Sequence, residues 1–434
     1  MNKIKVGVVS LGCDKNRVDT ETMLAKIAEK GYDIVSDPSE ADVIVVNTCA
    51  FIEPARKEAV DTIFEMNSYK KSGLKKLVVA GCMGELYGKE LFDELPEADA
   101  VCGTNFASVA DVIEKTLAGE RVFSASDKTG CMSLSERVLS TPSHFAYLKI
   151  ADGCDNYCSY CLIPKIRGRY RSAPLDELAA EAEKLARGGV SELILVAQDV
   201  TKYGADLYGK KSLVPLLRRL VAIDGLRRVR LMYCYPELID DELLDFIVSE
   251  DKICNYLDIP LQHVDSGILK LMNRKSDYES VCALFDKLRD KYPQIAVRST
   301  FICGFPTETQ AQHEKVREFL KKYRLHNVGF FAYSREEGTP AAKMSGQISE
   351  AEKKRRVADL YKTQSAVACE INRGYVGKTI GCLVDKDGLG RAEFQAPDVD
   401  GIVKISSDRR LHSGEYVQVY INSFDKYDLI GEAK

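Results

Sequence analysis

The sequence lacks any apolar stretch long enough to cross a membrane, and it has no low-complexity tract. A membrane-spanning helix needs about 20 consecutive apolar residues. The apolar run in the opening segment, MNKIKVGVVSLGC, is much shorter and lacks the cleavage pattern of a signal peptide. We therefore expect this run to be a buried strand of a cytoplasmic protein that has no membrane partner.

The chain also lacks the excess of positive charge that a broad nucleic-acid-binding surface usually carries. It has 61 Lys and Arg against 65 Asp and Glu, a net charge of −4. This balance argues against such a surface but not against a locally basic groove. The length of 434 residues, with 45% hydrophobic and 29% charged residues, fits a globular protein of roughly two to four domains.

Cysteine, by contrast, is abundant, with 14 residues. In a reducing compartment, thiols at set positions are more often metal ligands or catalytic groups than disulfide partners. Cys154, Cys158 and Cys161 form a CxxxCxxC pattern, CDNYCSYC, after the apolar run Tyr147–Ala151. Thiolates select zinc, copper(I) or iron–sulfur clusters. No nearby His or fourth Cys completes a closed tetrahedral zinc site.

A 4Fe-4S cluster normally takes four cysteines, so a motif that supplies three leaves one iron open to a substrate. The spacing resembles the signature of the radical S-adenosylmethionine (SAM) superfamily. That resemblance implies that the open iron binds the amino and carboxylate groups of SAM. The alternatives are a structural metal site and three unrelated thiols. We favour the cluster because spacing, strand placement and domain pattern agree.

Residues 1–119 alternate short apolar strands with helical patterns. Apolar strands separated by helices predict an open parallel α/β sheet that is covered on both faces. The predicted strands are Val6–Ser10, Asp33–Val35, Val43–Asn47 and Leu77–Ala80.

Three further cysteines follow these strands at their carboxyl ends. Cys13 follows the first strand, Cys49 the third and Cys82 the fourth. In open α/β sheets, ligands bind at that edge. We therefore predict that the three thiols converge there and hold a second cluster. The alternative is three buried core thiols, because free cysteine packs as a small hydrophobic residue.

The rest of the chain divides into three regions. Residues 119–143 are polar and Ser-rich, which predicts a linker. Residues 140–370 contain six apolar strands separated by helices such as Leu175–Arg187 and Ser280–Lys291. This predicts an incomplete (β/α)6 barrel whose active site lies at the carboxyl ends of its strands. Residues 372–434 have short strands between Gly- and Asp-containing turns, which predicts a small antiparallel β barrel. The six predicted strands are Tyr147–Ala151, Leu193–Ala197, Val229–Tyr233, Tyr256–Leu261, Ala296–Cys303 and Val328–Tyr333.

The whole chain resembles the methylthiotransferases, radical SAM enzymes with an N-terminal three-cysteine domain and a C-terminal TRAM domain. The segments SLGCDKNRVDTE, NTCAFI, GCMG, CDNYCSYCLIPKIRGRYRS, IPLQH and YSREEGTPA are similar to blocks of that family. The resemblance implies domains at 1–119, 140–370 and 372–434. It also implies two 4Fe-4S clusters and SAM as cofactors. Beyond the cluster ligands, we assign no catalytic residue.

The family has two branches. One modifies an aspartate on small-subunit ribosomal protein twelve, and the other modifies adenosine beside the anticodon of tRNA. SLGCDKNRVD and the terminal GRAEFQAPDVDG and YDLIGE are more similar to the ribosomal branch. A terminal module with nine Lys or Arg and ten Asp or Glu fits a basic protein partner better than tRNA. We therefore predict the ribosomal branch, with tRNA modification as the alternative.

The resemblance implies that SAM is cleaved reductively, that a radical removes hydrogen from the β-carbon of the aspartate, and that a methylthio group replaces it. The electron comes from a donor such as flavodoxin or ferredoxin. We expect the two clusters to face each other, because sulfur must reach the activated carbon. A rival of a different class is a non-enzymatic iron–sulfur carrier or a metal-dependent RNA-binding protein.

Several other residues are candidates for contact with SAM, each with a structural alternative. Tyr160 and Phe305 are predicted to flank the adenine, and Gln198 and Asp199 to reach the ribose. Arg298 is predicted to bind the SAM carboxylate, and a structural ion pair is the alternative.

For a second group of residues, the sequence gives a less specific indication of function. His263 lies at a strand end and contacts substrate or SAM, or it is a structural histidine. The basic run Arg167, Arg169 and Arg171 is a solvated face or holds the acidic loop of the target. Thr307 stands where the family often has glycine. The eight other cysteines are expected to be structural or incidental, and they are Cys102, Cys131, Cys234, Cys254, Cys282, Cys303, Cys369 and Cys382.

Overall fold

The computed structural model describes residues 3–126, 128, 132 and 134–434, and Cys131 lies outside them. The chain divides into two compact units. The first unit comprises Met1–Ser140, Ala151–Asp155 and Cys161–Pro174, and the second comprises Thr141–Ile150, Asn156–Tyr160 and Leu175–Lys434. Within the described part of the chain, no helix combines the length and the apolar character that crossing a membrane requires.

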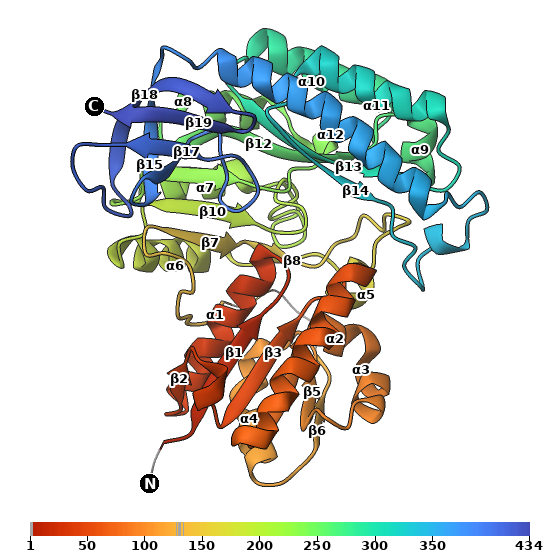
Figure 1. Cartoon of the computed structure of the whole chain (residues 1–434), viewed down its shortest axis with the longest axis vertical. Helices are drawn as coiled ribbons and strands as arrows, with labels where there is room; N and C mark the ends of the chain where they lie inside the picture. The colour runs from red at the N-terminus through yellow and green to blue at the C-terminus, as the bar shows by residue number, and fades with distance from the viewer. Residues whose placement is uncertain (1–2, 127, 129–131, 133) are drawn as a thin grey trace. The chain divides into compact units, whose positions relative to one another are not determined.

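The first unit is built on a six-stranded sheet in which every neighbouring pair is parallel (Figure 1). The strand order is β2-β1-β3-β4-β5-β6. This order reverses between β1 and β3, so ligands are expected to bind at the carboxyl ends of these two strands. The strands are β1 (Lys5–Ser10), β2 (Asp33–Val35), β3 (Val43–Thr48), β4 (Lys76–Gly81), β5 (Ala100–Cys102) and β6 (Val122–Ser124).

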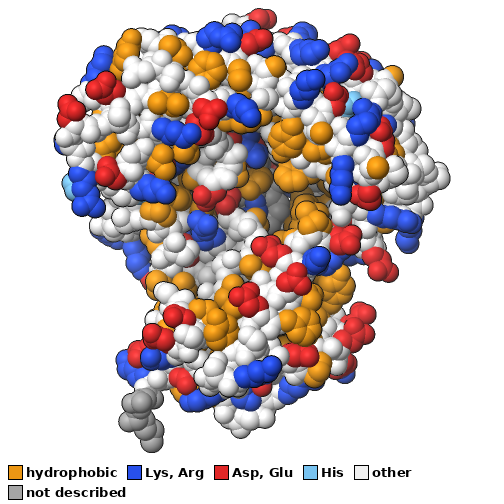
Figure 2. Space-filling view, viewed as in Figure 1, with side chains coloured by type: hydrophobic (Ala, Val, Ile, Leu, Met, Phe, Trp, Pro, Cys, Tyr) orange, Lys and Arg blue, Asp and Glu red, His pale blue; other side chains and the backbone are white. Residues whose placement is uncertain are grey.

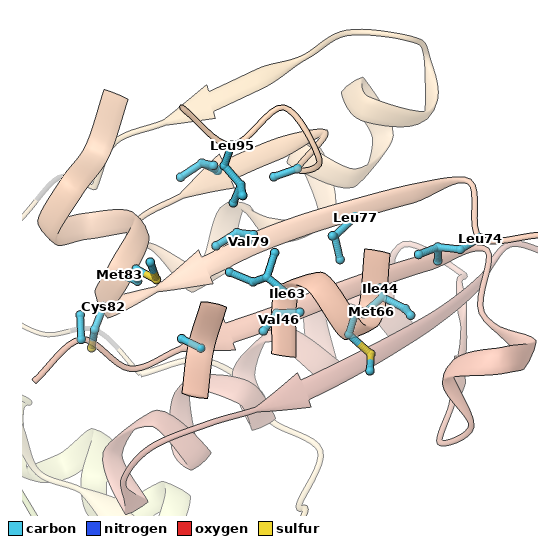
Figure 3. Packing of buried hydrophobic residues seen from close by; sticks show 14 of the residues in the cluster. Ile44, Val46, Ile63, Met66, Leu74, Leu77, Val79, Cys82, Met83 and Leu95 are labelled. Atoms are coloured by element: carbon cyan, nitrogen blue, oxygen red, sulfur yellow. The ribbon is translucent and has the colours of Figure 1, made fainter. Parts of the chain in front are cut away.

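Helices cover both faces of this sheet because successive strand residues point to opposite sides. Val45 of β3 packs in one core cluster with Met23 of α1. The next residue, Val46, packs in the other cluster with Ile63 of α2, and Figure 3 shows this second cluster. The helices are α1 (Asp14–Glu29), α2 (Glu53–Ser68), α3 (Cys82–Glu94) and α4 (Val109–Leu117).

The first unit also includes the segments on either side of the CxxxCxxC loop. Strands β8 (Ala151–Asp152) and β9 (Arg171–Ser172) pair with each other in antiparallel fashion. The short helix α5 (Ile163–Ile166) packs into the α2 side of the sheet, where Ile166 joins the same apolar cluster as Met83. The residues that follow Cys161 are therefore part of the core of this unit.

The second unit begins with a six-stranded parallel sheet whose spatial order follows the chain, β7-β10-β11-β12-β13-β14. Sequential parallel strands joined by helices are the arrangement of a partial (β/α) barrel. The strands are β7 (Phe145–Lys149), β10 (Glu192–Val196), β11 (Arg228–Leu231), β12 (Ile253–Gln262), β13 (Ala296–Cys303) and β14 (Asn327–Ala332). The helices are α6 (Leu175–Arg187), α7 (Leu213–Val221), α8 (Asp241–Ser249), α9 (Ser266–Leu271), α10 (Tyr278–Lys291), α11 (Gln310–Tyr323) and α12 (Glu350–Arg373).

The end of the second unit is a closed five-stranded barrel with the order β15-β16-β17-β19-β18. Its pairs are antiparallel except for β17 and β19, which run parallel. Positive and negative side chains are interspersed over the face of the molecule shown in Figure 2. The strands are β15 (Thr379–Lys386), β16 (Leu389–Ala392), β17 (Val403–Ser406), β18 (Tyr416–Asp425) and β19 (Asp428–Ala433). Short 3-10 turns occur at Pro38–Glu40, Tyr69–Ser72, Phe106–Ser108, Pro236–Leu238 and Ala341–Lys343.

A buried ionic network joins this barrel to the parallel sheet within the second unit. Glu192 of β10 pairs with Arg230 of β11 at 2.9 Å and with Arg391 of β16 at 2.8 Å. Arg391 also pairs with Asp385 of β15, and Asp385 in turn contacts His144 just before β7. Because all three members of the Glu192 group are buried, the barrel and the sheet share one desolvated set of charges.

The predicted fold class is confirmed, one local prediction is corrected and one strand was missed. The predicted linker at 119–143 contains β6, which pairs with β5 in the first sheet. The missed strand is β5, which was not predicted from the sequence. Both strands have only three residues, too few for a hydrophobic period to stand out. The linker prediction otherwise falls partly on residues outside the described ones.

Candidate functional site

Cys13, Cys49 and Cys82 lie just beyond the carboxyl ends of neighbouring strands of the first unit. Cys13 immediately precedes α1, Cys49 follows β3, and Cys82 is the first residue of α3. Figure 3 shows Cys82 beyond the arrowhead of β4. Cys13 and Cys49 flank the point where the strand order reverses. The positive ends of α1 and α3 also favour negative charge at Cys13 and Cys82.

The buried side chain of Asn16, in the first turn of α1, connects the three cysteine loops. Its Nδ2 donates to the carbonyl of Leu11, two residues before Cys13, at 3.0 Å. It also donates to the carbonyl of Thr48, directly before Cys49, at 3.1 Å. The Oδ1 of Asn16 lies 3.6 Å from the Sγ of Cys82. Sequence reasoning missed Asn16, because an amide in a helical turn carries no signal of such a role.

Glycines with left-handed backbone directly precede two of these cysteines. Gly12 has φ 92°, and a Cβ there would lie 2.8 Å from the Cβ of Cys49. Gly81 has φ 94°, and a Cβ there would lie 2.3 Å from the Oδ1 of Asn47. Both the conformation and the close approach therefore require glycine. These two glycines let the loops that carry Cys13 and Cys82 come together.

The electrostatics of the trio follow from burial and from one arginine. Burial raises the pKa of the Cys82 thiol to about 11, with Arg167 opposing the shift and Cys13 and Cys49 adding to it. Burial also raises the pKa of Cys49. Cys49 and Cys82 would therefore each lose a proton less easily than an exposed cysteine. A metal that binds here must displace protons from buried thiols.

The donor set of Cys13, Cys49 and Cys82 fits an iron–sulfur cluster by its chemistry. Among the described residues, no three His, Cys, Asp or Glu side chains already have the geometry of a metal site. Three convergent thiols are nevertheless the soft donors that such a cluster takes. A cavity of about 240 Å³ lies beside Cys13 and is lined by Ser10, Leu11, Gly12, Cys13, Asp14, Arg17 and Ser140.

The structure contradicts the sequence-based prediction for Arg167. Its side chain is only 2% exposed and pairs with Asp19 at 2.7 Å and Asp152 at 3.3 Å. A buried side chain cannot present its charge to solvent or to a target protein, so both interpretations offered for Arg167 are wrong. Arg169 has an 83% exposed side chain, as expected of a solvated face. Arg171 is partly buried and donates to the carbonyl of Arg167.

The CxxxCxxC cysteines are held by loop contacts within each unit. In the first unit, the backbone N–H of Cys154 donates to the carbonyl of Gly168 at 3.1 Å. The Sγ of Cys161 accepts from the backbone N–H of Ile163 at 3.4 Å. In the second unit, the Sγ of the buried Cys158 lies 3.9 Å from the hydroxyl of Tyr235. All three thiols stay predicted cluster ligands.

Tyr160 and Phe305, both predicted to flank adenine, belong to one apolar cluster of the second unit. Phe305 is buried and meets Tyr333 edge to face at 5.3 Å between ring centroids. Tyr160 is only partly buried and packs against the same group, which also contains Met272. The two aromatic side chains therefore belong to one apolar cluster, and their contact with the adenine of SAM stays a prediction.

Gln198 and Asp199 follow β10, at the carboxyl end of the sheet. Asp199 is fully buried, and burial raises its pKa. Its carboxylate accepts from the Thr201 hydroxyl at 2.6 Å and from the Lys202 backbone N–H at 3.2 Å. Asn156, within the CxxxCxxC loop, donates to the same carboxylate at 3.4 Å. Asp199 is thus tied to the segment that carries Cys158, and its role toward the ribose stays a prediction.

Arg298 and His263 have partners within the protein. Arg298 pairs with Asp258 at 3.0 Å and with Asp400 at 3.4 Å, which fits the alternative of a structural ion pair. The Nδ1 of His263 accepts from the backbone N–H of Asp265 at 2.9 Å. Burial lowers the pKa of His263 to about 4, so the ring is neutral at physiological pH. The SAM contact of Arg298 stays a prediction.

The turn after β13 contains a strained residue, Thr307, with φ 70°. A left-handed conformation costs a β-branched side chain about 1–2 kcal/mol. Because Thr307 is exposed, Thr307→Gly should lose little packing and raise the free energy of unfolding by about 1 kcal/mol. Urea denaturation would measure this change. The matched control is Thr309→Gly, which removes the N-cap of α11 and should stabilise nothing; equal gains from both variants would contradict the strain argument.

Comparison with known proteins assigns three regions of the chain. Residues 5–103 match Uncharacterized protein family UPF0004. Residues 148–320 match the Radical SAM superfamily, and residues 376–433 match the TRAM domain. The three matches follow one another along the chain in the order that the sequence predicted.

Full-length relatives share the whole arrangement. The chain is 47% identical over 440 residues to a protein of Lachnoclostridium phytofermentans named ribosomal protein uS12 methylthiotransferase RimO, covering 99% of this chain and 100% of the relative. It is 47% identical to a protein of the same name from Clostridium botulinum, covering 99% and 98%. A third, from Thermoanaerobacter sp., is 44% identical and covers 98% and 99%.

Solved structures support the fold at low identity. The radical SAM methyltransferase TsrM from Kitasatospora setae aligns with a TM-score of 0.57 at 15% identity, covering 92% of this chain and 82% of that one. OxsB, a cobalamin-dependent SAM radical enzyme, aligns with a TM-score of 0.51 at 11% identity, covering 84% and 56%. The chain is nearly half identical to these named relatives over its full length, and it has both cysteine trios. The chain therefore belongs to the family of ribosomal protein uS12 methylthiotransferases.

Proposed function

We propose that this protein attaches a methylthio group to the β-carbon of an aspartate on ribosomal protein uS12. The reaction replaces one C–H bond by a C–S bond. The hydrogen leaves on the 5′-deoxyadenosyl group of one SAM as 5′-deoxyadenosine, and the sulfur takes its methyl group from a second SAM, which leaves as S-adenosylhomocysteine. The observation that carries this proposal is the convergence of Cys13, Cys49 and Cys82 at one sheet edge. A radical SAM enzyme that only cleaves SAM has no need of a second trio.

The two cysteine trios would hold two clusters with different roles. When bound, the clusters and SAM supply electron transfer, a carbon-centred radical and sulfur, chemistry that side chains alone do not provide. Cys154, Cys158 and Cys161 would hold the cluster that faces SAM. Cys13, Cys49 and Cys82 would hold the sulfur-delivering one. We propose that the two clusters face each other, so that sulfur reaches the activated carbon.

The residues around the SAM position would bind and orient it. The partly buried Tyr160 would offer an aromatic surface for the adenine, and the buried Phe305 belongs to the apolar cluster that supports Tyr160. Gln198 and Asp199, which follow β10, would reach the ribose from the carboxyl end of the sheet. Apolar walls of this kind also exclude water from a reactive radical.

The choice of a ribosomal protein over tRNA is supported by the charge of the chain and by the relatives. Ribosomal proteins present basic surfaces, and a chain of net charge −4 attracts them rather than nucleic acid. Reductive cleavage also needs an electron, and we propose a small donor such as flavodoxin or ferredoxin. Because the target is a ribosomal protein, we place the reaction in the cytoplasm.

The test is anaerobic reconstitution followed by incubation with SAM, a reductant and either purified uS12 or tRNA. We expect a mass increase of one methylthio group in place of hydrogen on an aspartate of uS12, and no change in tRNA. Mass spectrometry of proteolytic peptides and of nucleosides measures both. A modified adenosine with unmodified uS12 would overturn the proposal in favour of the tRNA branch.

A further inference from the structure

Arg167 forms a four-point contact at the cysteine rim of the first unit. It lies six residues after Cys161, in the segment that follows the CxxxCxxC loop. Its Nη1 donates to Asp19 at 2.7 Å and to Asp152 at 3.3 Å. Its Nη2 donates to the Oδ1 of Asn16 at 2.6 Å and to the Sγ of Cys82 at 3.4 Å. One guanidinium thus contacts a cysteine of the N-terminal trio and the strand that leads into Cys154.

The contact with Asn16 fixes which way that amide points. Because Arg167 donates and cannot accept, it selects the oxygen of Asn16 and leaves the nitrogen to donate elsewhere. That nitrogen then bonds the carbonyls of Leu11 and Thr48, which precede Cys13 and Cys49. The two carbonyls select the nitrogen and Arg167 selects the oxygen, so both ends of the amide are held in one orientation. Arg167 therefore reinforces the amide that links the three cysteine loops, and it also contacts Cys82 directly.

The planar fork of arginine suits this role and the point charge of lysine does not. A guanidinium presents five donors in a rigid plane, whereas an ammonium offers three donors on a flexible stem. Two carboxylates, Asp19 and Asp152, neutralise the charge within the buried site. The remaining donors are thus held toward Asn16 and Cys82.

We propose that Arg167 is a positioning residue of the N-terminal cluster, which it holds and tunes through hydrogen bonds to Cys82 and Asn16. This inference rests on the proposed function, because it assumes that the trio binds a cluster. Partners that orient metal ligands typically contribute about 10–100-fold to metal affinity. Hydrogen bonds to cluster sulfur atoms also change the reduction potential. Assembly of the sulfur-delivering cluster would then depend on a residue of the radical SAM segment.

The experiment uses the full-length chain with Cys154, Cys158 and Cys161 all changed to alanine, so that the N-terminal cluster alone remains. This triple-alanine chain is the parent for the variants below. After anaerobic reconstitution, we expect the parent to hold about four irons per chain. Adding Arg167→Met should speed iron loss to a chelator by about tenfold. It should also shift the ratio of reduced to oxidised cluster about tenfold toward the oxidised form at a fixed potential, which is about 59 mV for one electron.

Two further variants separate the cluster role from folding. Arg169→Met removes the exposed neighbour in the same segment and should leave iron retention and potential at the parent values. Arg167→Lys keeps the buried charge but loses the fork. It should therefore fold, as judged by circular dichroism, and still lose iron faster than the parent. A merely structural arginine would change stability without moving the potential.

The outcomes distinguish this inference from the function it rests on. A parent that holds no iron would refute the N-terminal cluster and therefore both proposals. A parent with about four irons whose Arg167→Lys and Arg167→Met variants match Arg169→Met in iron loss and potential would refute the positioning role alone. Faster iron loss and a lower potential in the Arg167 variants, with folding retained in Arg167→Lys, would establish it.

Discussion

Replacing Cys154 by alanine should abolish the formation of 5′-deoxyadenosine, whereas replacing Cys49 should spare it and stop methylthio transfer. The reason is that the two trios are proposed to serve different steps: an electron must reach SAM before any C–H bond can break, and sulfur is needed only afterwards. Anaerobic assays with SAM and uS12 would measure 5′-deoxyadenosine by chromatography and the modified peptide by mass spectrometry. The expected loss in each case is complete, because each proposed cluster would have three protein ligands and none to spare.

A matched control for Cys49 exists in the same sheet. Cys102 is buried at the end of β5, where its Sγ lies 3.7 Å from the carbonyl of Val79. It packs in an apolar cluster and belongs to neither trio. Cys102→Ala should therefore keep both products. Loss of 5′-deoxyadenosine in Cys49→Ala, or full methylthio transfer in that variant, would contradict the assignment of the trios.

Glu192→Gln should lower the free energy of unfolding of the second unit by about 3–5 kcal/mol, the cost of leaving buried charges without their partner. Arg230 and Arg391 are both essentially inaccessible and lie 2.9 and 2.8 Å from the Glu192 carboxylate. The substitution keeps the shape of the side chain and removes its charge. Urea denaturation followed by far-ultraviolet circular dichroism measures the change. Because these groups join the barrel to the sheet, a separate early transition of the barrel is also expected.

The same network gives a pH dependence with a definite sign. Burial alone would raise the pKa of Glu192, but Arg391, Arg230 and Arg228 outweigh it and hold the pKa far below the ordinary value. A depressed pKa in the folded state means that the stability is present above the unfolded value of about 4.3 and is lost as pH falls below it. The difference between wild type and Glu192→Gln should therefore shrink on acidification.

An exposed glutamate in the same unit serves as the control for Glu192. Glu370 pairs with Arg324 at 3.2 Å, and both side chains are about half exposed. Exposed pairs contribute at most about 1 kcal/mol. Glu370→Gln should thus change the unfolding free energy little at any pH. If both glutamine variants behaved alike, the buried network would not be the link between barrel and sheet.

Much of the fold and part of the site could be predicted because their signals are local. The strand Ala296–Cys303 and the helix Leu175–Arg187 were predicted with the bounds that the structure has. Their apolar residues recur with the period of the element, so a short window contains the information. The family and the ribosomal branch, predicted from motifs, are confirmed by relatives that match over the full length.

The contacts of charged and amide side chains were not predictable in this way. Arg167 reaches Asn16 across 151 positions of sequence, and Arg391 reaches Glu192 across nearly 200. Arginine and asparagine are mostly found at protein surfaces, so the sequence pattern favoured a solvated face for Arg167. Whether such a group is buried depends on the partners that neutralise its charge, and only the folded chain brings these partners together.

The sequence by itself therefore determined the family, its chemistry and which strands the predicted cluster ligands follow, since motifs, spacing and strand ends are properties of short segments. The tertiary structure alone decided how those thiols are oriented and how the barrel is attached. Asn16, Arg167 and Glu192 acquire their roles from partners that are distant in the chain. The physical reason is that a buried polar group is stable when its hydrogen-bonding partners are in place, and their positions are fixed by packing.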